Sequence, residues 1–165
     1  MNPRTLMFGL FSLVPSAALA HAELSASSIE DGATVTGPLA EVSLTFTEAA
    51  ELAFSTFKVY PLPAGTGDDP GGDAATDEDD HVDESGHGAL DAAAETLMAA
   101  VMDARDDAGA RADAGVTPAT GQSETVTVRL KDDLEPGAYA VMWRVLSVDS
   151  HAIEGFLTFT YDPGE

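Results

Sequence analysis

The sequence predicts an all-β domain, an antiparallel β-sandwich or barrel, that carries one long acidic and partly helical insertion. Short segments in which apolar and polar residues alternate are divided by Gly and Pro, the pattern of half-buried strands joined by turns. Residues 21–165 are enough for one domain with a sizeable core. The chain has no cysteine, which excludes a disulfide framework and a thiolate metal site.

Residues 1–20 have the features of a secretory signal peptide. Arg4 supplies a positive charge, an apolar run extends from Leu6 to about Leu19, and Ala18-Leu19-Ala20 is a small-x-small cleavage pattern. The run is shorter than the roughly 20 apolar residues of a membrane span, so an uncleaved anchor is the less favoured alternative. Cleavage would yield an exported domain, residues 21–165, that begins at His21. Its strongly negative charge, −22 for the whole chain, argues against nucleic acid or an anionic membrane surface as partner.

The first strands are expected between residues 30 and 61. Glu30-Asp31-Gly32 predicts a turn before a short strand at Thr34–Val35. Apolar residues at every second position predict a half-buried strand over Glu41–Thr47. A loop or short helical turn is expected at Glu48–Leu52, and a further strand at Ser55–Tyr60.

The stretch Leu62–Gln122 differs in character and is interpreted as an insertion between two strands. It holds 15 Asp or Glu residues against two Arg. Gly65–Gly86 is expected to be a mobile acidic loop, because it offers almost nothing to bury. Ala89–Ala108 is rich in Ala and carries apolar residues at helical spacing, which predicts a helix with one packed stripe: Leu90, Leu97 and Val101.

Regular alternation returns after the insertion. Strands are predicted at Thr125–Leu130, Ala138–Leu146 and Gly155–Tyr161, with a Pro-Gly turn within Asp132–Gly137. Trp143 shares one face of its strand with other apolar residues, so we expect it in the core rather than in a site. The inward-facing set of the last two strands is Tyr139, Val141, Trp143, Val145, Leu157, Phe159 and Tyr161.

A candidate metal site follows the penultimate strand, in Ser147-Val148-Asp149-Ser150-His151. An extended segment would project Asp149 and His151 to the same side, where a carboxylate and an imidazole make half of a site. His21, once N-terminal, would add its α-amine and a ring nitrogen in one chelate. Three nitrogens and one oxygen favour Cu(II). Affinity should rise with pH, because the metal displaces a proton from an α-amine of pKa about 7.7–8.0.

The alternative to a metal site is that these histidines have ordinary structural roles. His151 could be a hydrogen-bonded histidine at a strand end, with Asp149 a turn residue beside Ser147. His81 and His87 lie among acidic residues of the insertion; they are interpreted as incidental in a solvated loop, with a weak metal-scavenging tract as the alternative.

Two blocks of the sequence resemble CopC-type copper-resistance proteins. The first is His21-Ala22-Glu23-Leu24-Ser25-Ala26-Ser27 with the following Asp31–Val35, Pro38 and Val42–Phe46. The second, more specific block is Leu134–His151 with Gly155-Phe156 and Phe159, which contains the Trp-Arg, Ser-x-Asp-x-His and Gly-Phe elements.

This resemblance implies a periplasmic Cu(II)-binding domain of immunoglobulin-like type, with one copper ion held by His21, Asp149 and His151. It also implies a possible partner, a CopD-like inner-membrane copper-import protein. The long insertion and Ser150, where the family often has Gly or a small polar residue, depart from the family pattern. Some members carry a Met-rich Cu(I) site, whereas Met98, Met102 and Met142 are expected here in the core.

The function that the sequence favours is copper binding, to sequester or carry the ion in copper resistance or homeostasis, without enzymatic activity. One alternative is an enzyme similar to copper monooxygenases, which also use an N-terminal His chelate. The other is an immunoglobulin-like interaction module without metal. Nucleophilic hydrolysis and phosphate binding lack their motifs, since no Gly-x-Ser-x-Gly and no phosphate-cradling Gly loop is found.

Overall fold

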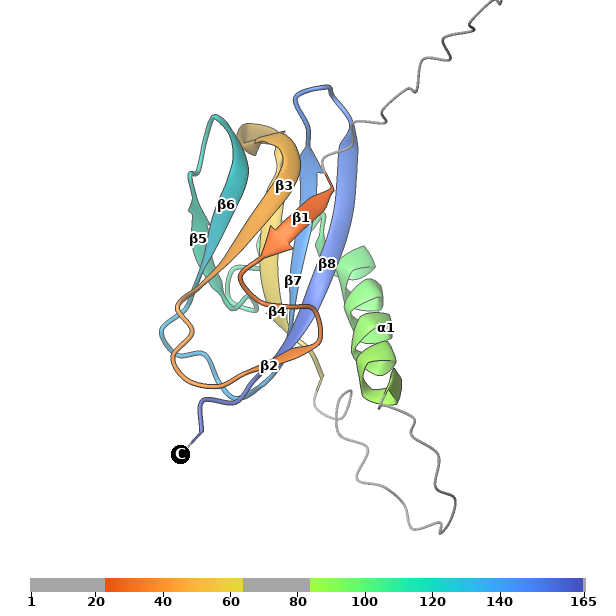
Figure 1. The fold of residues 1–165 in the computed structure, drawn as a ribbon, viewed down its shortest axis with the longest axis vertical. Helices are drawn as coiled ribbons and strands as arrows, with labels where there is room; N and C mark the ends of the chain where they lie inside the picture. The colour runs from red at the N-terminus through yellow and green to blue at the C-terminus, as the bar shows by residue number, and fades with distance from the viewer. Residues whose placement is uncertain (1–22, 64–83, 165) are drawn as a thin grey trace, which may run out of the picture.

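The computed structural model describes residues 23–63 and 84–164, which form two facing β-sheets with one helix against the outside (Figure 1). The first sheet has the order β1-β3-β6-β5 and the second the order β2-β8-β7-β4. All pairs are antiparallel except β2 and β8, which are parallel. The predicted β-sandwich is confirmed, with one parallel pair that the sequence analysis did not foresee. The first sheet consists of β1 (Leu24–Ser27), β3 (Glu41–Glu51), β6 (Gln122–Leu130) and β5 (Asp113–Thr117). The second consists of β2 (Ala33–Val35), β8 (Ala152–Tyr161), β7 (Gly137–Leu146) and β4 (Thr56–Pro61).

The main core lies between the two sheets and is built by the alternating residues. Val42, Leu44 and Phe46 of β3 are buried and meet side chains of β7 and β8 from the opposite sheet. Trp143 is in this core, as predicted, and its ring lies 6.1 Å from that of Phe46 in an edge-to-face arrangement. Full burial of such side chains supplies the main driving force for folding in a chain that has no disulfide.

Gly155 provides the space that Trp143 needs. The two residues are directly paired across β7 and β8. A Cβ atom at position 155 would lie 2.6 Å from Cζ2 of the indole, closer than side-chain carbons approach one another. The spacing between the Trp and the Gly-Phe element therefore has a packing origin.

Helix α1 (Glu84–Val101) covers the outer face of the second sheet, alongside β8 (Figure 1). Its buried Leu90 and Ala94 pack with Ala140 and Met142 of β7 in a second hydrophobic cluster. Strand β7 is thus buried on both faces, and Met142 is fully enclosed. Met98 and Met102 belong to the same cluster, so the three methionines pack as core residues.

Several boundaries differ from the sequence analysis. The helix spans Glu84–Val101 rather than Ala89–Ala108, so Glu84–Gly86 is helical and not part of a loop. Strand β3 continues to Glu51, where a loop was expected, because Ala50 pairs with Ser123 and bridges to Ser147. A 3-10 turn, η1 (Leu52–Phe54), follows it.

Some predictions concern residues outside the described ranges, and two strands of the structure were not predicted. The predicted signal peptide, residues 1–20, and residues 65–83 of the predicted acidic loop lie outside the described part of the chain. Strands β1 and β5 were not predicted. Within residues 23–63 and 84–164, no helix combines the length and apolar character needed to cross a membrane.

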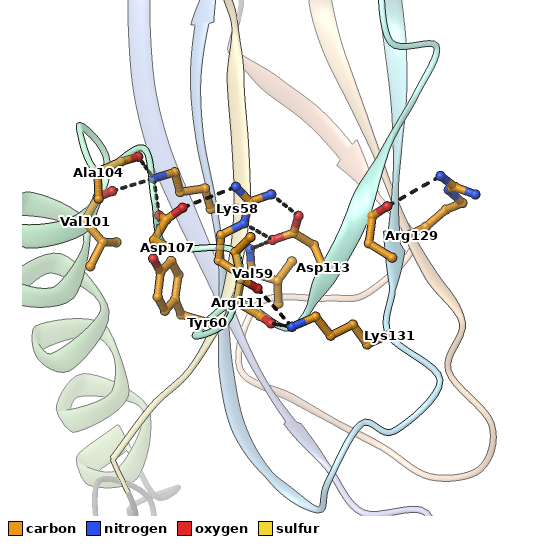
Figure 2. A network of polar contacts seen from close by, with 12 residues as sticks. Lys58, Val59, Tyr60, Val101, Ala104, Asp107, Arg111, Asp113, Arg129 and Lys131 are labelled. Carbon is orange, nitrogen blue, oxygen red and sulfur yellow. Dashed lines mark hydrogen bonds and ion pairs between the residues drawn. The ribbon is translucent and has the colours of Figure 1, made fainter.

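A network of polar contacts attaches the segment after α1 to the edge of the sandwich (Figure 2). Lys58 of β4 is only 2% exposed, and its Nζ donates hydrogen bonds to the carbonyls of Val101 at 2.6 Å and Ala104 at 2.7 Å. The same ammonium contacts Asp107 Oδ2 at 2.5 Å, and the hydroxyl of Tyr60 donates to that oxygen at 2.6 Å.

The charges in this network shift two pKa values in opposite directions. The Lys58 ammonium and the Tyr60 hydroxyl lower the pKa of Asp107 to about 2 by their hydrogen bonds. Burial first, and then the neighbouring Asp107 carboxylate, raises the pKa of Tyr60 to about 12. At neutral pH the network is therefore an ammonium–carboxylate pair with a neutral phenol.

A second carboxylate joins the two sheets next to this pair. Oδ1 of the buried Asp113 accepts hydrogen bonds at 2.9 Å from the backbone N–H of Val59 and from Nε of Arg111. The N–H of Ala112 donates to the carbonyl of Val59 at 2.8 Å. Strand β5 is thereby held beside β4, the edge of the other sheet.

Candidate metal centre

The predicted Asp149 and His151 lie in the tight loop that connects β7 to β8. The N–H of Ser147 donates to the carbonyl of His151 at 2.9 Å, and the N–H of Ser150 donates to the carbonyl of Ser147 at 2.9 Å. Ser150 has a φ of 71°, the left-handed conformation that side-chain-bearing residues rarely adopt. The segment is therefore a turn, and the expectation of an extended segment here was wrong.

The turn nevertheless brings the two side chains together. Nδ1 of His151 lies 2.8 Å from Oδ2 of Asp149. The other carboxylate oxygen, Oδ1, accepts hydrogen bonds from the Ser147 hydroxyl and, at 3.3 Å, from the N–H of His151. The carboxylate and the imidazole are thus held by the loop itself.

Electrostatics and exposure leave this pair suited to a cation. The Ser147 hydroxyl, followed by His151, lowers the pKa of Asp149 to about 2, because both stabilise the ionised carboxylate. The side chains of His151 and Asp149 are 61% and 34% exposed, so an ion arriving from solvent can reach them. The site offers an anionic oxygen beside an imidazole at neutral pH.

The end of β3 lies beside this loop, and the first described residue lies beside β3. Val148 donates its N–H to the carbonyl of Ala49 at 3.2 Å. Two positions earlier on β3, Thr47 donates its N–H to the carbonyl of Glu23 at 2.8 Å, and Glu23 donates to the Thr47 hydroxyl at 3.0 Å. His21, the third predicted ligand, lies outside the described residues.

Glu48 is a functional candidate that the sequence analysis missed. It sits between Thr47 and Ala49, and its Oε2 is buried without a hydrogen-bond partner among residues 23–63 and 84–164. A buried carboxylate oxygen without a donor is costly, and a cation would compensate it. The signal was present in the sequence, because Glu48 continues the every-second-residue series of Val42, Leu44 and Phe46. The available donors, carboxylate oxygens and an imidazole, fit a divalent copper ion.

Comparisons with known proteins agree with this architecture. A family model described as the CopC domain matches residues 24–100 and 88–162. CopC from Methylosinus trichosporium OB3b is 20% identical, with a TM-score of 0.50, over 88% of this chain and 97% of its own. PcoC, a methionine-rich copper resistance protein from Escherichia coli, is 22% identical, with a TM-score of 0.51, over 87% of this chain and 100% of its own. A comparison with curated proteins gives no match.

Proposed function

The chain belongs to the CopC family, and from this premise we propose that it is an exported copper-resistance protein that binds one Cu(II) ion and sequesters or carries it. The observation that carries the proposal is the contact between His151 Nδ1 and Asp149 Oδ2 at 2.8 Å in the β7–β8 loop. It places an imidazole and an ionised carboxylate together on an accessible surface, as a copper ligand pair requires.

His21 is proposed as the third ligand, through its α-amine and its ring. Glu23 is fixed beside Thr47, and two residues of chain span at most about 7 Å. Two positions beyond Thr47 on β3, the carbonyl of Ala49 accepts the N–H of Val148 in the metal loop. A newly formed N-terminus two residues before Glu23 is therefore within reach of the loop that holds Asp149 and His151.

Each protein group has a distinct part in holding the ion. Asp149 is ionised throughout the neutral range and contributes negative charge without losing a proton. The α-amine must lose one, which makes binding stronger as pH rises through about 7.7–8.0. We propose Glu48 as a further carboxylate of the site, on the grounds of its buried Oε2 and its place on β3.

The proposed location is the periplasm, reached through residues 1–20 as a signal peptide. A CopD-like membrane protein is the proposed partner for copper transfer, as the family implies. Val148, 48% exposed, lies within the metal loop; Phe54 of η1, 72% exposed, precedes Ser55, whose hydroxyl accepts the N–H of Leu146 at the end of β7. Exposed large hydrophobic side chains commonly mark interaction surfaces when they occur together.

The test compares protein that begins at His21 with the same protein carrying one additional residue before it. We expect Cu(II) EPR to show one tetragonal centre in the first, and competition titration to show at least about tenfold weaker binding in the second, a change of about 1.4 kcal/mol. His151→Ala should weaken binding similarly, whereas His81→Ala, which changes a histidine outside the site, should not.

Two outcomes would contradict the proposal. Equal copper affinity with and without the additional residue would exclude the N-terminal chelate. Copper binding that is lost on His81→Ala and kept on His151→Ala would assign the ion to the acidic insertion. As a check on the enzymatic alternative, the copper-loaded protein with a reductant should consume no more oxygen than free copper at the same concentration.

A further inference from the structure

A second group of metal-ligating side chains lies where helix α1 meets the loop between β1 and β2. Asp31 comes from that loop, and His87 and Asp91 come from the first turns of the helix. One ligand atom from each residue lies within 4.8 Å of those of the other two. Nε2 of His87 is 3.8 Å from Asp31 Oδ2 and 3.7 Å from Asp91 Oδ2.

The fold positions each of the three side chains. Oδ1 of Asp31 accepts hydrogen bonds from the N–H of Thr158 at 2.7 Å and from its hydroxyl at 3.3 Å, so the carboxylate is fixed against β8. The His87 ring packs against Gly32, where an added Cβ would lie 2.7 Å from Nδ1. His87 and Asp91 are one turn apart on the same face of α1.

The distances do not describe a hydrogen-bonded cluster. Separations of 3.7 and 3.8 Å are too long for hydrogen bonds between the imidazole and either carboxylate. Metal bonds of about 2.1 Å in tetrahedral geometry separate ligand atoms by about 3.4 Å, so a small contraction around an ion would suffice. Asp91 presents Oδ2 to His87, while its Oδ1 is buried without a hydrogen-bond partner among residues 23–63 and 84–164, so an ion at Oδ2 would offset the charge of a carboxylate with few donors.

We propose that Asp31, His87 and Asp91 form a second site for a divalent transition-metal ion, with water completing its coordination. One imidazole nitrogen and two carboxylate oxygens suit Zn²⁺. The three side chains are about 40–50% exposed, which gives the ion and its waters access. A bound ion would cross-link the start of α1 to the β-sandwich.

This site is independent of the proposed copper site. Asp31 bonds to Thr158, six residues along β8 from Ala152 at the metal loop, a distance of roughly 20 Å along the strand. Loss of His21 or His151 should leave the second site intact. Failure of one proposal therefore does not imply failure of the other.

The experiment uses protein that carries one additional residue before His21 together with His151→Ala, so that both histidines of the proposed first site are impaired. Isothermal titration with Zn²⁺ should show one equivalent bound. His87→Ala and Asp91→Asn should each weaken it at least tenfold, while far-UV circular dichroism stays unchanged. His81→Ala, in the same acidic segment, is the matched control and should leave the affinity unchanged.

Hydrogen exchange gives a readout that does not depend on the titration. Zinc should slow exchange of amides in residues 84–91 of the parent and should not do so in the His87→Ala variant. The proposal is overturned if no zinc binds, or if His87→Ala binds as well as the parent. It is also overturned if His81→Ala and His87→Ala weaken binding equally, which would mean diffuse attraction by the acidic tract.

Discussion

Replacing Lys58 with Met tests whether the buried ammonium holds the segment after α1 to the sandwich. The side chain is 2% exposed, and its charge is shared between the carbonyls of Val101 and Ala104 and the carboxylate of Asp107. Met has similar length, so it fills the space but provides no donor. Asp107 and both carbonyls then lose their strongest partner in a position that water hardly reaches.

The expected cost follows from these contacts. Removing one member of a buried ion pair costs about 3–5 kcal/mol, because the other charge is left without compensation. Asp107 keeps the Tyr60 hydroxyl at 2.6 Å and has an Arg111 nitrogen at 3.6 Å, so we place Lys58→Met near the lower end, about 3 kcal/mol. Against a typical stability of about 5–15 kcal/mol, the variant should still fold.

Urea unfolding of the metal-free protein at pH 7 measures this cost with two probes. Trp143, the single tryptophan, reports on the core through its fluorescence, and ellipticity at 222 nm reports on α1. With a slope of about 2 kcal/mol/M, the midpoint should fall by about 1.5 M. Arg129→Met, which removes an exposed cation 3.5 Å from the carbonyl of Ala114, should change stability by less than about 0.5 kcal/mol.

Asp107→Asn tests whether the cost of Lys58→Met comes from loss of the Lys58–Asp107 ion pair or from a general disruption of packing. In a double-mutant cycle it should cost much less in the Lys58→Met background than in the parent, because the charge that it removes is already unpaired there. The reasoning is refuted if Lys58→Met costs less than about 1 kcal/mol, or if the two substitutions are additive.

Three other predictions concern the β7–β8 hairpin and the stability of the protein at acid pH. Gly155→Ala should destabilise the protein by about 1–3 kcal/mol, because a methyl group would meet the Trp143 ring; an unchanged urea midpoint would contradict this. Ser150→Gly should raise the free energy of unfolding by about 1 kcal/mol by relieving the left-handed φ, and a lower thermal midpoint would count against it. The lowered pKa of Asp107 contributes stability that is complete above about pH 4 and is lost as pH falls through about 2, so stability should decline there less steeply in Lys58→Met.

The strands that face the core on one side were predictable from the sequence. Alternation in β3, β6 and β8 follows directly from the contact of one strand face with the opposite sheet, whereas β7 is also covered by α1 on its other face. The edge strands β1 and β5 were not predictable in this way. No residue of β1 is buried, and β5 contains Gly115 in a left-handed conformation beside an irregular register. Their structure depends on pairing with β3 and β6, which sequence periodicity does not report.

The sequence indicated that Asp149 and His151 lie together in the candidate copper site. The structural reason for their proximity differs from the one inferred from the sequence. Spacing of two residues suggested a shared strand face for Asp149 and His151, whereas a turn with its own hydrogen bonds brings them together. Glu48 was missed because β3 was expected to end before it. Asp31 lies more than 50 positions from His87 and Asp91, so a local pattern could indicate the His87–Asp91 pair but not the group of three.

The acidic segment that follows α1 is attached to the β-sandwich by ion pairs. Asp103, Asp107 and Asp113 each contact a cation, Asp103 on the exposed surface and the other two at more buried positions. Asp103 contacts Arg144, which directly follows Trp143 on β7 and also contacts Glu154 on β8. These acids attach the segment to β4, β5 and the β7–β8 hairpin, the same hairpin whose loop carries Asp149 and His151. Because the partners are up to 49 residues apart in the sequence, charge composition alone could not distinguish attachment from solvation. Part of the stretch that was interpreted as an insertion, Leu62–Gln122, thus contacts the hairpin that carries the proposed copper loop.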